Sequence, residues 1–157
     1  MAKKIFDTPD TTAQFAPEDI ELNNRLSLLA YLGILPWLVP MFLVKQSRFA
    51  KFHANQGLVL IILNVILGII TGALNGIASL IGSGITALFF KMASSWGAMF
   101  LGTVGTVIST IITIIAAILS ILLSIVVLFL TVVGIIYAVK GRAKELPLIG
   151  RFKILKY

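Results

Sequence analysis

The stretch GLVLIILNVILGIITGALNGIASLIGSGITALFF, residues 57–90, contains no charged side chain. A single cation, Lys91, separates it from MASSWGAMFLGTVGTVISTIITIIAAILSILLSIVVLFLTVVGIIYAV, residues 92–139, which is also uncharged. The hydrocarbon core of a bilayer is about 30 Å thick, and roughly 20 apolar residues of helix cross it. Each block exceeds that length, and the core of a soluble domain has no use for so long an uncharged run. The sequence therefore predicts an all-α, polytopic integral membrane protein.

Composition and charge support the same class. Hydrophobic residues make up 59% of the 157 residues, above the roughly 45–50% of globular domains. The net charge of +7 is divided unevenly: −2 over residues 1–25, +3 over 45–53, +1 at Lys91 and +5 over 140–157. Basic groups beside apolar spans are typical of the cytoplasmic face and of contact with anionic headgroups, whereas a nucleic-acid surface interleaves them with exposed aromatics. We predict the cytoplasmic membrane as the location, lipids as partners and no nucleic-acid partner.

Three transmembrane helices are predicted, near residues 26–44, 57–77 and 108–139. Residues 1–25 form a polar N-terminal tail, disordered to residue 16, and a helix start at Pro17, where Glu18 and Asp19 favour the positive end of the helix dipole. This helix is predicted to continue to residue 44, with kinks at Pro36 and Pro40. Residues 26–157 then form a single membrane domain.

The region between the second and third predicted spans, residues 76–105, is rich in glycine, serine and aromatic residues around Lys91. It is predicted to be an interfacial connector at the membrane surface. A fourth span remains an alternative if residues 78–100 cross. The charge distribution favours three spans, with the N-terminus outside and with the 45–56 loop and the tail in the cytoplasm.

Small and polar residues recur at helical spacing on the second and third predicted spans, which lets helix backbones approach closely in lipid. These two stripes predict that the helices pack antiparallel. The predicted packing residues are Asn64, Gly68, Gly72, Gly76, Thr110, Thr113, Ala117, Ser120 and Ser124. A hydroxyl-lined face would alternatively line a water path, so a small pore or transporter is the second hypothesis.

The tail, residues 140–157, alternates cations with apolar side chains. It is too short and too charged to cross a bilayer and is predicted to lie on an anionic leaflet as a basic amphipathic segment. The predicted lipid-headgroup contacts are Lys140, Arg142, Lys144, Arg151, Lys153 and Lys156.

Residues that carry catalysis are scarce. Five of the six carboxylates precede residue 22, the sixth is Glu145, His53 is the only histidine, and there is no cysteine. Catalysis and metal binding need converging groups of these types. We therefore predict a protein that is not an enzyme, with no catalytic residues, no metal site and no cofactor, and we interpret His53 as an interfacial polar residue.

Two segments, SRFAKFHANQGLVL at 47–60 and VKGRAKELPLIGRFKILK at 139–156, form a recognisable pair. Together they resemble a family of small prokaryotic membrane proteins of undetermined function, related to the chloroplast inner-envelope import component of twenty kilodaltons. The motif residues are Phe52, His53, Asn55, Gln56, Gly57, Gly141, Lys144, Leu146, Pro147, Ile149 and Gly150.

The resemblance covers about residues 30–157 and implies a compact helical membrane domain of three or four spans. For the plant relatives it implies a role in moving proteins across a membrane. The predicted function is therefore that of a non-enzymatic subunit for membrane assembly or translocation. Such a subunit would act through helix packing and through contacts with lipid, with a protein partner or with a second copy of itself.

Overall fold

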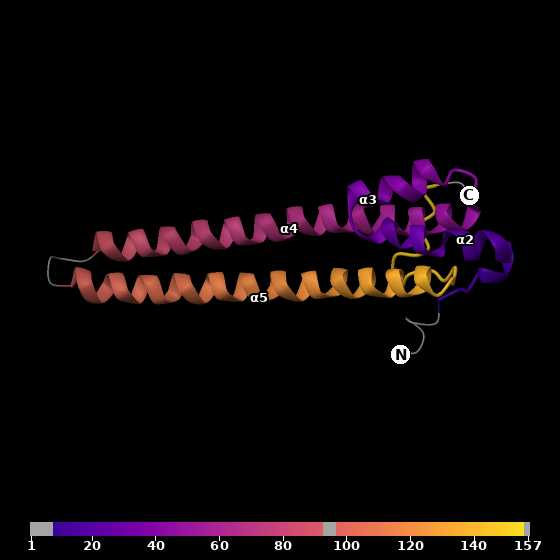
Figure 1. Ribbon diagram of the computed structural model, residues 1–157. Helices are drawn as coiled ribbons and strands as arrows, with labels where there is room; N and C mark the ends of the chain where they lie inside the picture. The colour runs from indigo at the N-terminus through magenta and orange to yellow at the C-terminus, as the bar shows by residue number, and fades with distance from the viewer. Residues whose placement is uncertain (1–7, 93–96, 156–157) are drawn as a thin grey trace. The chain divides into compact units, whose positions relative to one another are not determined.

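The computed structural model describes residues 8–92 and 97–155, and helices form nearly all of its regular structure (Figure 1). The described residues also contain one isolated antiparallel bridge, between Asp10 and Lys144. The helical elements are η1 (Thr12–Gln14), α2 (Pro17–Ser27), η2 (Leu28–Tyr31), α3 (Ile34–Leu38), the π-helical turn η3 (Val39–Leu43), α4 (Arg48–Met92) and α5 (Ala98–Val139). The all-α prediction is confirmed at this level.

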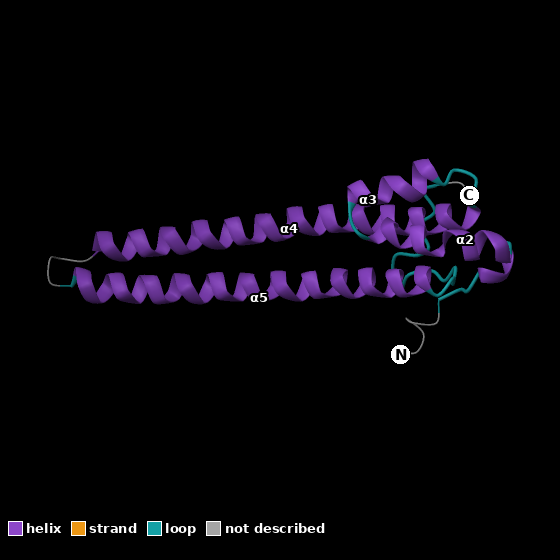
Figure 2. Ribbon diagram, in the orientation of Figure 1, coloured by secondary structure: helices purple, strands orange, loops and turns teal. Residues whose placement is uncertain are grey.

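The chain divides into two compact units, which we describe separately. Unit 1 comprises residues 1–65 and 126–157, and unit 2 comprises residues 66–125. Helices α4 and α5 contribute to both. The loops of unit 1, teal in Figure 2, are the N-terminal segment, the bend that follows η3 and the C-terminal tail.

The predicted connector over residues 76–105 is wrong, because α4 continues without a break to Met92 and α5 begins at Ala98. Residues 93–96 lie outside the described part of the chain. The predicted 57–77 and 108–139 spans are therefore portions of longer helices, residues 48–56 are helix rather than loop, and 78–92 is no separate fourth span. The glycine, serine and threonine residues of this region do not interrupt the helix, because hydroxyls can bond within it. Ser83 and Thr86 each bond a carbonyl within α4, those of Leu80 and Gly82.

The first predicted span is not one helix. Helix α2 begins at Pro17 as expected, with Glu18 and Asp19 in its first turn, but it ends at Ser27. Short helical pieces follow, separated at Gly33, whose φ of 112° is readily available only to glycine. The turn η3 is a π-helix that contains Pro40, consistent with the missing backbone donor of proline. The apolar residues 34–43 thus form ten residues of helix, too few for a crossing.

The two ends of the chain meet in unit 1. The N–H of Thr11 donates to the carbonyl of Ala143 at 2.9 Å, and the N–H of Glu145 donates to the carbonyl of Pro9 at 3.2 Å. Residues 8–16 are therefore ordered, contrary to the prediction of disorder, although residues 1–7 lie outside the description. Segments that share hydrogen bonds lie on one side of any bilayer, so these bonds do not agree with the predicted placement of the N-terminus outside and the tail in the cytoplasm.

In unit 2, α4 and α5 run antiparallel and side by side. The amide of Asn75 donates to Ser120 Oγ at 2.8 Å, and a Cβ added at Gly82 would lie 2.9 Å from Ser109 Cβ. Ala78 and Ala116 are buried. Of the predicted packing residues, Ser120 therefore lies in this contact.

The remaining predicted packing residues do not lie in this contact. A Cβ added at Gly68, Gly72 or Gly76 would meet no described atom within 4 Å. Side chains of the rest of the set are exposed: Asn64, Thr110, Thr113, Ala117 and Ser124. The buried face of α5 instead includes Gly105 and Ala116, about one residue away from the predicted stripe. On a helix one residue turns the face by roughly 100°, which explains why spacing alone selected the wrong side.

Candidate functional site

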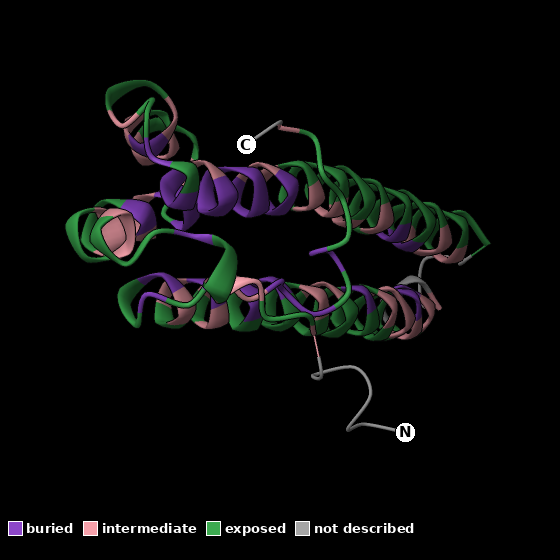
Figure 3. Ribbon diagram, turned by 90° about the vertical axis from the view of Figure 1, so that its right-hand side faces the viewer, coloured by how far each residue is buried: buried purple, intermediate pink, exposed green. Residues whose placement is uncertain are grey.

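The polar turns at the start of α4 are the most deeply buried part of unit 1. His53 and Asn55 are fully buried and Gln56 is 1% exposed. Figure 3 shows this concentration of buried residues at one end of α4. Polar side chains are buried at a cost unless their hydrogen bonds are satisfied, so the partners of these three residues define the site.

The start of α4 is capped from two directions. Ser47 Oγ accepts the N–H of Ala50 at 2.9 Å, and Asp19 Oδ2 accepts the N–H of Phe49 at 3.1 Å. Both acceptors satisfy donors that the first turn of a helix leaves free. Serine immediately before a helix is a recognisable N-cap signal in sequence, whereas the carboxylate of Asp19 reaches α4 only because α2 folds back.

His53 lies inside an aromatic cage. Its ring centroid is 4.6 Å from that of Phe49, 5.2 Å from that of Phe52 and 5.8 Å from that of Tyr31, each in an edge-on arrangement. Tyr31 Oη lies 2.8 Å from Nδ1 of the histidine. Among the described residues, no hydrogen-bond partner of ordinary geometry reaches Nε2. The interpretation of His53 as an interfacial residue is therefore wrong.

The protonation state of His53 follows from this cage. The ring precedes the charge-free block that begins at Gly57, and burial lowers the pKa of His53 to about 3, opposed in part by the backbone of Arg142. A buried ring with no carboxylate beside it is stable only when neutral. At neutral pH the histidine is therefore an uncharged hydrogen-bonding partner of Tyr31.

Acidification should consequently destabilise unit 1. An unfolded histidine has a pKa of about 6.5, so below that pH the unfolded chain binds a proton that the folded chain excludes. Stability is complete above about pH 6.5 and should fall by up to about 1.4 kcal/mol per pH unit as the pH is lowered. Thermal unfolding in mild detergent at about pH 7 and about pH 5 measures this slope above the carboxylate range.

The control is His53→Gln, which keeps a hydrogen-bonding side chain but has no titrating group. Its absolute stability is expected to be lower, yet its pH slope in this window should be nearly flat. An identical slope in wild type and variant would assign the acid sensitivity to other groups.

Asn55 and Gln56 hold the C-terminal tail by its backbone. The Asn55 amide nitrogen donates to the carbonyl of Phe152 at 2.9 Å, and its oxygen accepts the N–H groups of Ile154 and Leu155 at 2.7 and 2.8 Å. Gln56 Nε2 donates to the carbonyl of Gly150 at 3.2 Å. Its oxygen accepts the N–H of Leu146 at 3.3 Å. Two neighbouring side-chain amides thus replace the backbone partners that the tail would have in regular structure.

Glycines make the return of the tail possible. Gly141 has a φ of 66° and ends α5, with the N–H of Arg142 bonded to the carbonyl of Tyr137 at 2.9 Å, as in a Schellman cap. At Gly150, a Cβ would lie 2.7 Å from the backbone nitrogen and oxygen of Leu146. Any larger residue at either position would oppose the turn that brings the tail to α4.

The N-terminal segment closes the site from the other side. The ring centroid of Phe15 lies 6.0 Å from that of Phe49 and 5.8 Å from that of Phe52, and Ala143 completes this buried cluster. Thr11 Oγ1 donates to the carbonyl of Ala143 at 2.8 Å. Three segments distant in sequence therefore share one core.

The structure brings the two halves of the predicted motif together. The buried members are Phe52, His53, Asn55, Gln56, Gly57, Gly141, Leu146, Pro147, Ile149 and Gly150. Lys144 is half-buried, with its Nζ 5.9 Å from the centre of the Tyr137 ring. Sequence reasoning missed Tyr31, Phe15 and Trp37, whose Nε1 donates to the carbonyl of Ala54 at 2.7 Å. No local signal distinguishes these from other aromatic residues near a membrane.

The predicted headgroup residues lie around this core. Lys140, Arg142, Arg151 and Lys153 are exposed, and Lys156 lies outside the described residues. The tail between them is not a helix: it forms turns and extended backbone, with Leu146 and Ile149 buried and with Phe152 and Ile154 exposed. Its basic groups remain accessible, whereas Leu146 and Ile149 are already buried inside unit 1.

We call this arrangement the clasp: Asn55 and Gln56 bind the backbone of the C-terminal tail, and His53 lies beside them in its aromatic cage. Apart from His53 Nε2, the polar side-chain atoms of His53, Asn55 and Gln56 are bonded to Tyr31 or to backbone groups of the tail. The residues that the structure describes include no group of three or more His, Cys, Asp or Glu side chains able to hold a metal ion. Searches of protein-family models, of curated proteins and of solved structures found no match for this chain.

Proposed function

We propose that this chain is an integral protein of the cytoplasmic membrane that crosses the bilayer twice, through α4 and α5, and acts without catalysis as an assembly subunit. The observation that carries the proposal is the exposure of its two long apolar helices. Only 17% of the most apolar window of α4 and 11% of that of α5 are buried. A core helix of a soluble protein would be mostly buried, so these side chains require lipid or another protein around them.

Helix length agrees with a double crossing. Residues 57–90 of α4 extend over about 51 Å and α5 over about 63 Å at 1.5 Å per residue. Both exceed the roughly 30 Å hydrocarbon core, so each helix would tilt or continue into the headgroup region.

Charge gives the orientation. The hydrogen bonds between residues 9–11 and 143–145 keep both ends of the chain on one side of the bilayer. The basic residues of 45–53 and of the tail belong to that same unit and are mostly exposed. Positive charge marks the cytoplasmic side, so unit 1 would face the cytoplasm and the C-terminal end of α4, at Met92, the other side.

The assembly role is supported by a free face of α4. Asn64, Gly68, Gly72 and Gly76 follow one another at four-residue steps and are exposed. Small residues in such a line allow a second helix to approach closely, and an amide exposed to hydrocarbon is costly until it finds a partner. A partner helix, or α4 of a second copy, would satisfy both conditions. The resemblance of the two-part motif to a translocation-related family supports a role of this kind.

The pore hypothesis receives less support. The hydroxyls of Thr110, Ser120, Ser124 and Thr131 each donate to a carbonyl four residues earlier in α5, at 2.8 to 2.9 Å. A hydroxyl that donates its hydrogen to its own helix backbone cannot donate it to water in a pore.

Cysteine labelling tests the two-span topology, and the chain has no native cysteine. In intact cells, single cysteines at the exposed positions Ala13, Gln46 and Lys153 should be shielded from an impermeant thiol reagent. A cysteine at Met92, which is 78% exposed at the end of α4, should be labelled. The first three positions are expected to be protected because they belong to unit 1, which would face the cytoplasm.

Permeabilised cells provide the control, because all four variants should then react. Labelling at Ala13 together with protection at Lys153 would restore the topology with the N-terminus outside and would contradict the proposal. Labelling of Ala13, Gln46 and Lys153 with protection of Met92 would mean that the orientation is reversed, and labelling of all four without permeabilisation would contradict the two-span topology.

A further inference from the structure

A large groove lies in unit 1, beside the residues that cap the start of α4. It has a volume of about 980 Å³ and runs between the first turns of α2 and the segment Phe42–Arg48 that leads into α4. One wall contains Glu18 and Asp19, and the other contains Lys45 and Arg48. The groove thus offers both signs of charge to one occupant.

The acidic wall has one carboxylate available. Asp19 is already committed, because Oδ1 accepts the amide of Asn23 at 2.9 Å and Oδ2 accepts the N–H of Phe49. Glu18 is exposed, as are Lys45 and Arg48 opposite. An occupant would therefore meet one free carboxylate and two free cations.

Apolar side chains continue the groove. Leu22, Phe42 and Leu43 line it and are 78%, 54% and 78% exposed. Phe42 and Leu43 end the apolar stretch 34–43, and Lys45 follows directly. Apolar groups next to paired charges are characteristic of the boundary between acyl chains and headgroups. A small water-soluble ion would make no favourable contact with these three apolar side chains.

We propose that this groove binds a phospholipid with a phosphate and a primary ammonium in its headgroup, that is, phosphatidylethanolamine, in the leaflet next to unit 1. Lys45 and Arg48 face the phosphate and Glu18 faces the ammonium, while Leu22, Phe42 and Leu43 contact the acyl chains. An anionic lipid leaves the carboxylate wall unpaired, and a choline headgroup has no N–H to donate to it.

This inference rests on the proposed membrane location, and nanodiscs test the two separately. The full-length chain is reconstituted in nanodiscs with equal amounts of phosphatidylethanolamine, phosphatidylcholine and phosphatidylglycerol, and the retained lipids are identified by native mass spectrometry. We expect phosphatidylethanolamine to be enriched. Glu18→Gln should lower its retention about two- to fivefold, as expected for one partly exposed charge pair. Lys45→Gln with Arg48→Gln should lower the retention of all three lipids.

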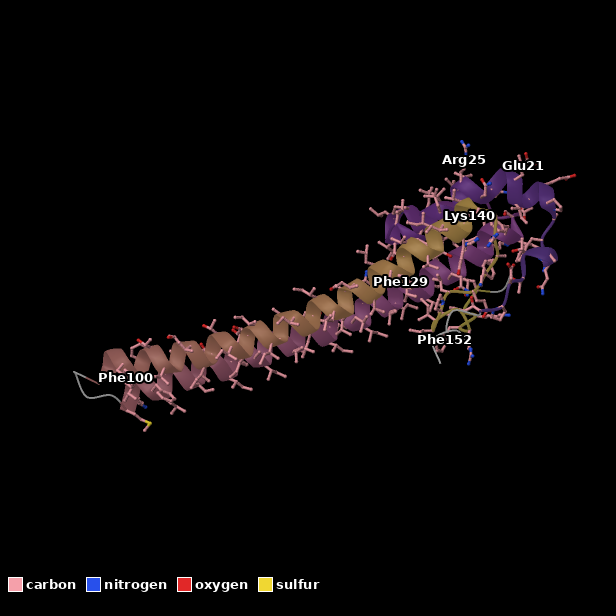
Figure 4. The ribbon with its side chains drawn as sticks, turned by 90° about the horizontal axis from the view of Figure 1, so that it is seen from below. Glu21, Arg25, Phe100, Phe129, Lys140 and Phe152 are labelled. Carbon is pink, nitrogen blue, oxygen red and sulfur yellow. The ribbon has the colours of Figure 1, made fainter. Side chains whose placement is uncertain are left out.

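Matched controls lie on the same helices. Glu21 and Arg25 project outward from α2 (Figure 4), are exposed and do not line the groove, and Lys51 in α4 does not line it either. Glu21→Gln and Lys51→Gln should retain lipid as wild type does. Equal retention of the three lipids by wild type, preference for phosphatidylglycerol, or equal effects of Glu18→Gln and Glu21→Gln would overturn the inference alone. A chain that never enters the nanodiscs would overturn the proposed function together with it.

Discussion

A Gly57→Ala variant is expected to lose most of the stability of unit 1. A Cβ at residue 57 would overlap the carbonyl oxygen of Ala30 and lie 2.8 Å from its carbonyl carbon. These are backbone atoms, so no side-chain rotation can relieve the overlap. Overpacked sites commonly cost about 1–3 kcal/mol and sometimes more, and we expect at least about 3 kcal/mol here because η2 and α4 must move apart. Thermal unfolding of the purified chain in mild detergent measures the loss.

Gly72→Ala is the matched control, since it makes the same chemical change in the same helix. No described atom lies within 4 Å of a Cβ placed there. Alanine in a helix is favoured over glycine by about 0.5–1 kcal/mol, so this variant should be as stable as wild type or slightly more so. If both variants unfold at the same temperature, the close approach of Gly57 to Ala30 is not present in the protein.

Removal of the Asn55 side chain is the second large expected effect. Asn55→Ala deletes three hydrogen bonds to the backbone of residues 152–155. At about 1 kcal/mol for each bond, we expect a cost of about 2–3 kcal/mol for holding the end of the tail. Trypsin should then cleave after Arg151 and Lys153 at least about tenfold faster, because cleavage follows the population of the opened tail.

Two further variants separate this effect from a general loss of polarity. Asn24→Ala removes an amide of the same size from α2 that takes no part in binding the tail, and should be cleaved at the wild-type rate. Asn55→Asp would bury a carboxylate and set one of its oxygens against the carbonyl oxygen of Phe152, so its tail should be cleaved at least as fast as that of Asn55→Ala. Cleavage of Asn55→Ala at the wild-type rate would contradict the clasp.

The sequence predicted the two long helices well because one property, the absence of charged side chains, determines them. The absence of charge over residues 57–90 and 92–139 predicted long apolar helices, and both are present. Their ends were predicted less well. Glycine and serine around Ser83 indicate a break in water, but inside an apolar environment the hydroxyl bonds its own helix and the helix continues.

The clasp could not be derived from local pattern. His53, Asn55 and Gln56 lie between Lys51 and an apolar span, and such neighbours are typical of a membrane surface. Their burial depends on Tyr31 and on a tail about a hundred residues further along the chain. Periodicity records which face of a helix is apolar, but it does not record which distant backbone will satisfy an amide. The resemblance of the two-part motif grouped these residues without giving the physical reason.

The contact between residues 9–11 and 143–145 joins a segment that is synthesised early to one that is synthesised late. The ribosome releases His53, Asn55 and Gln56 long before the residues that cover them, so in the proposed two-span protein α4 and α5 would enter the membrane while these side chains still face water. The polar turns can then be buried only after the residues of the tail have been synthesised, since domains fold as units. A nascent chain that stops before residue 150 would present an open aromatic cage and unpaired amides. Binding of the tail by Asn55 and Gln56 covers these groups.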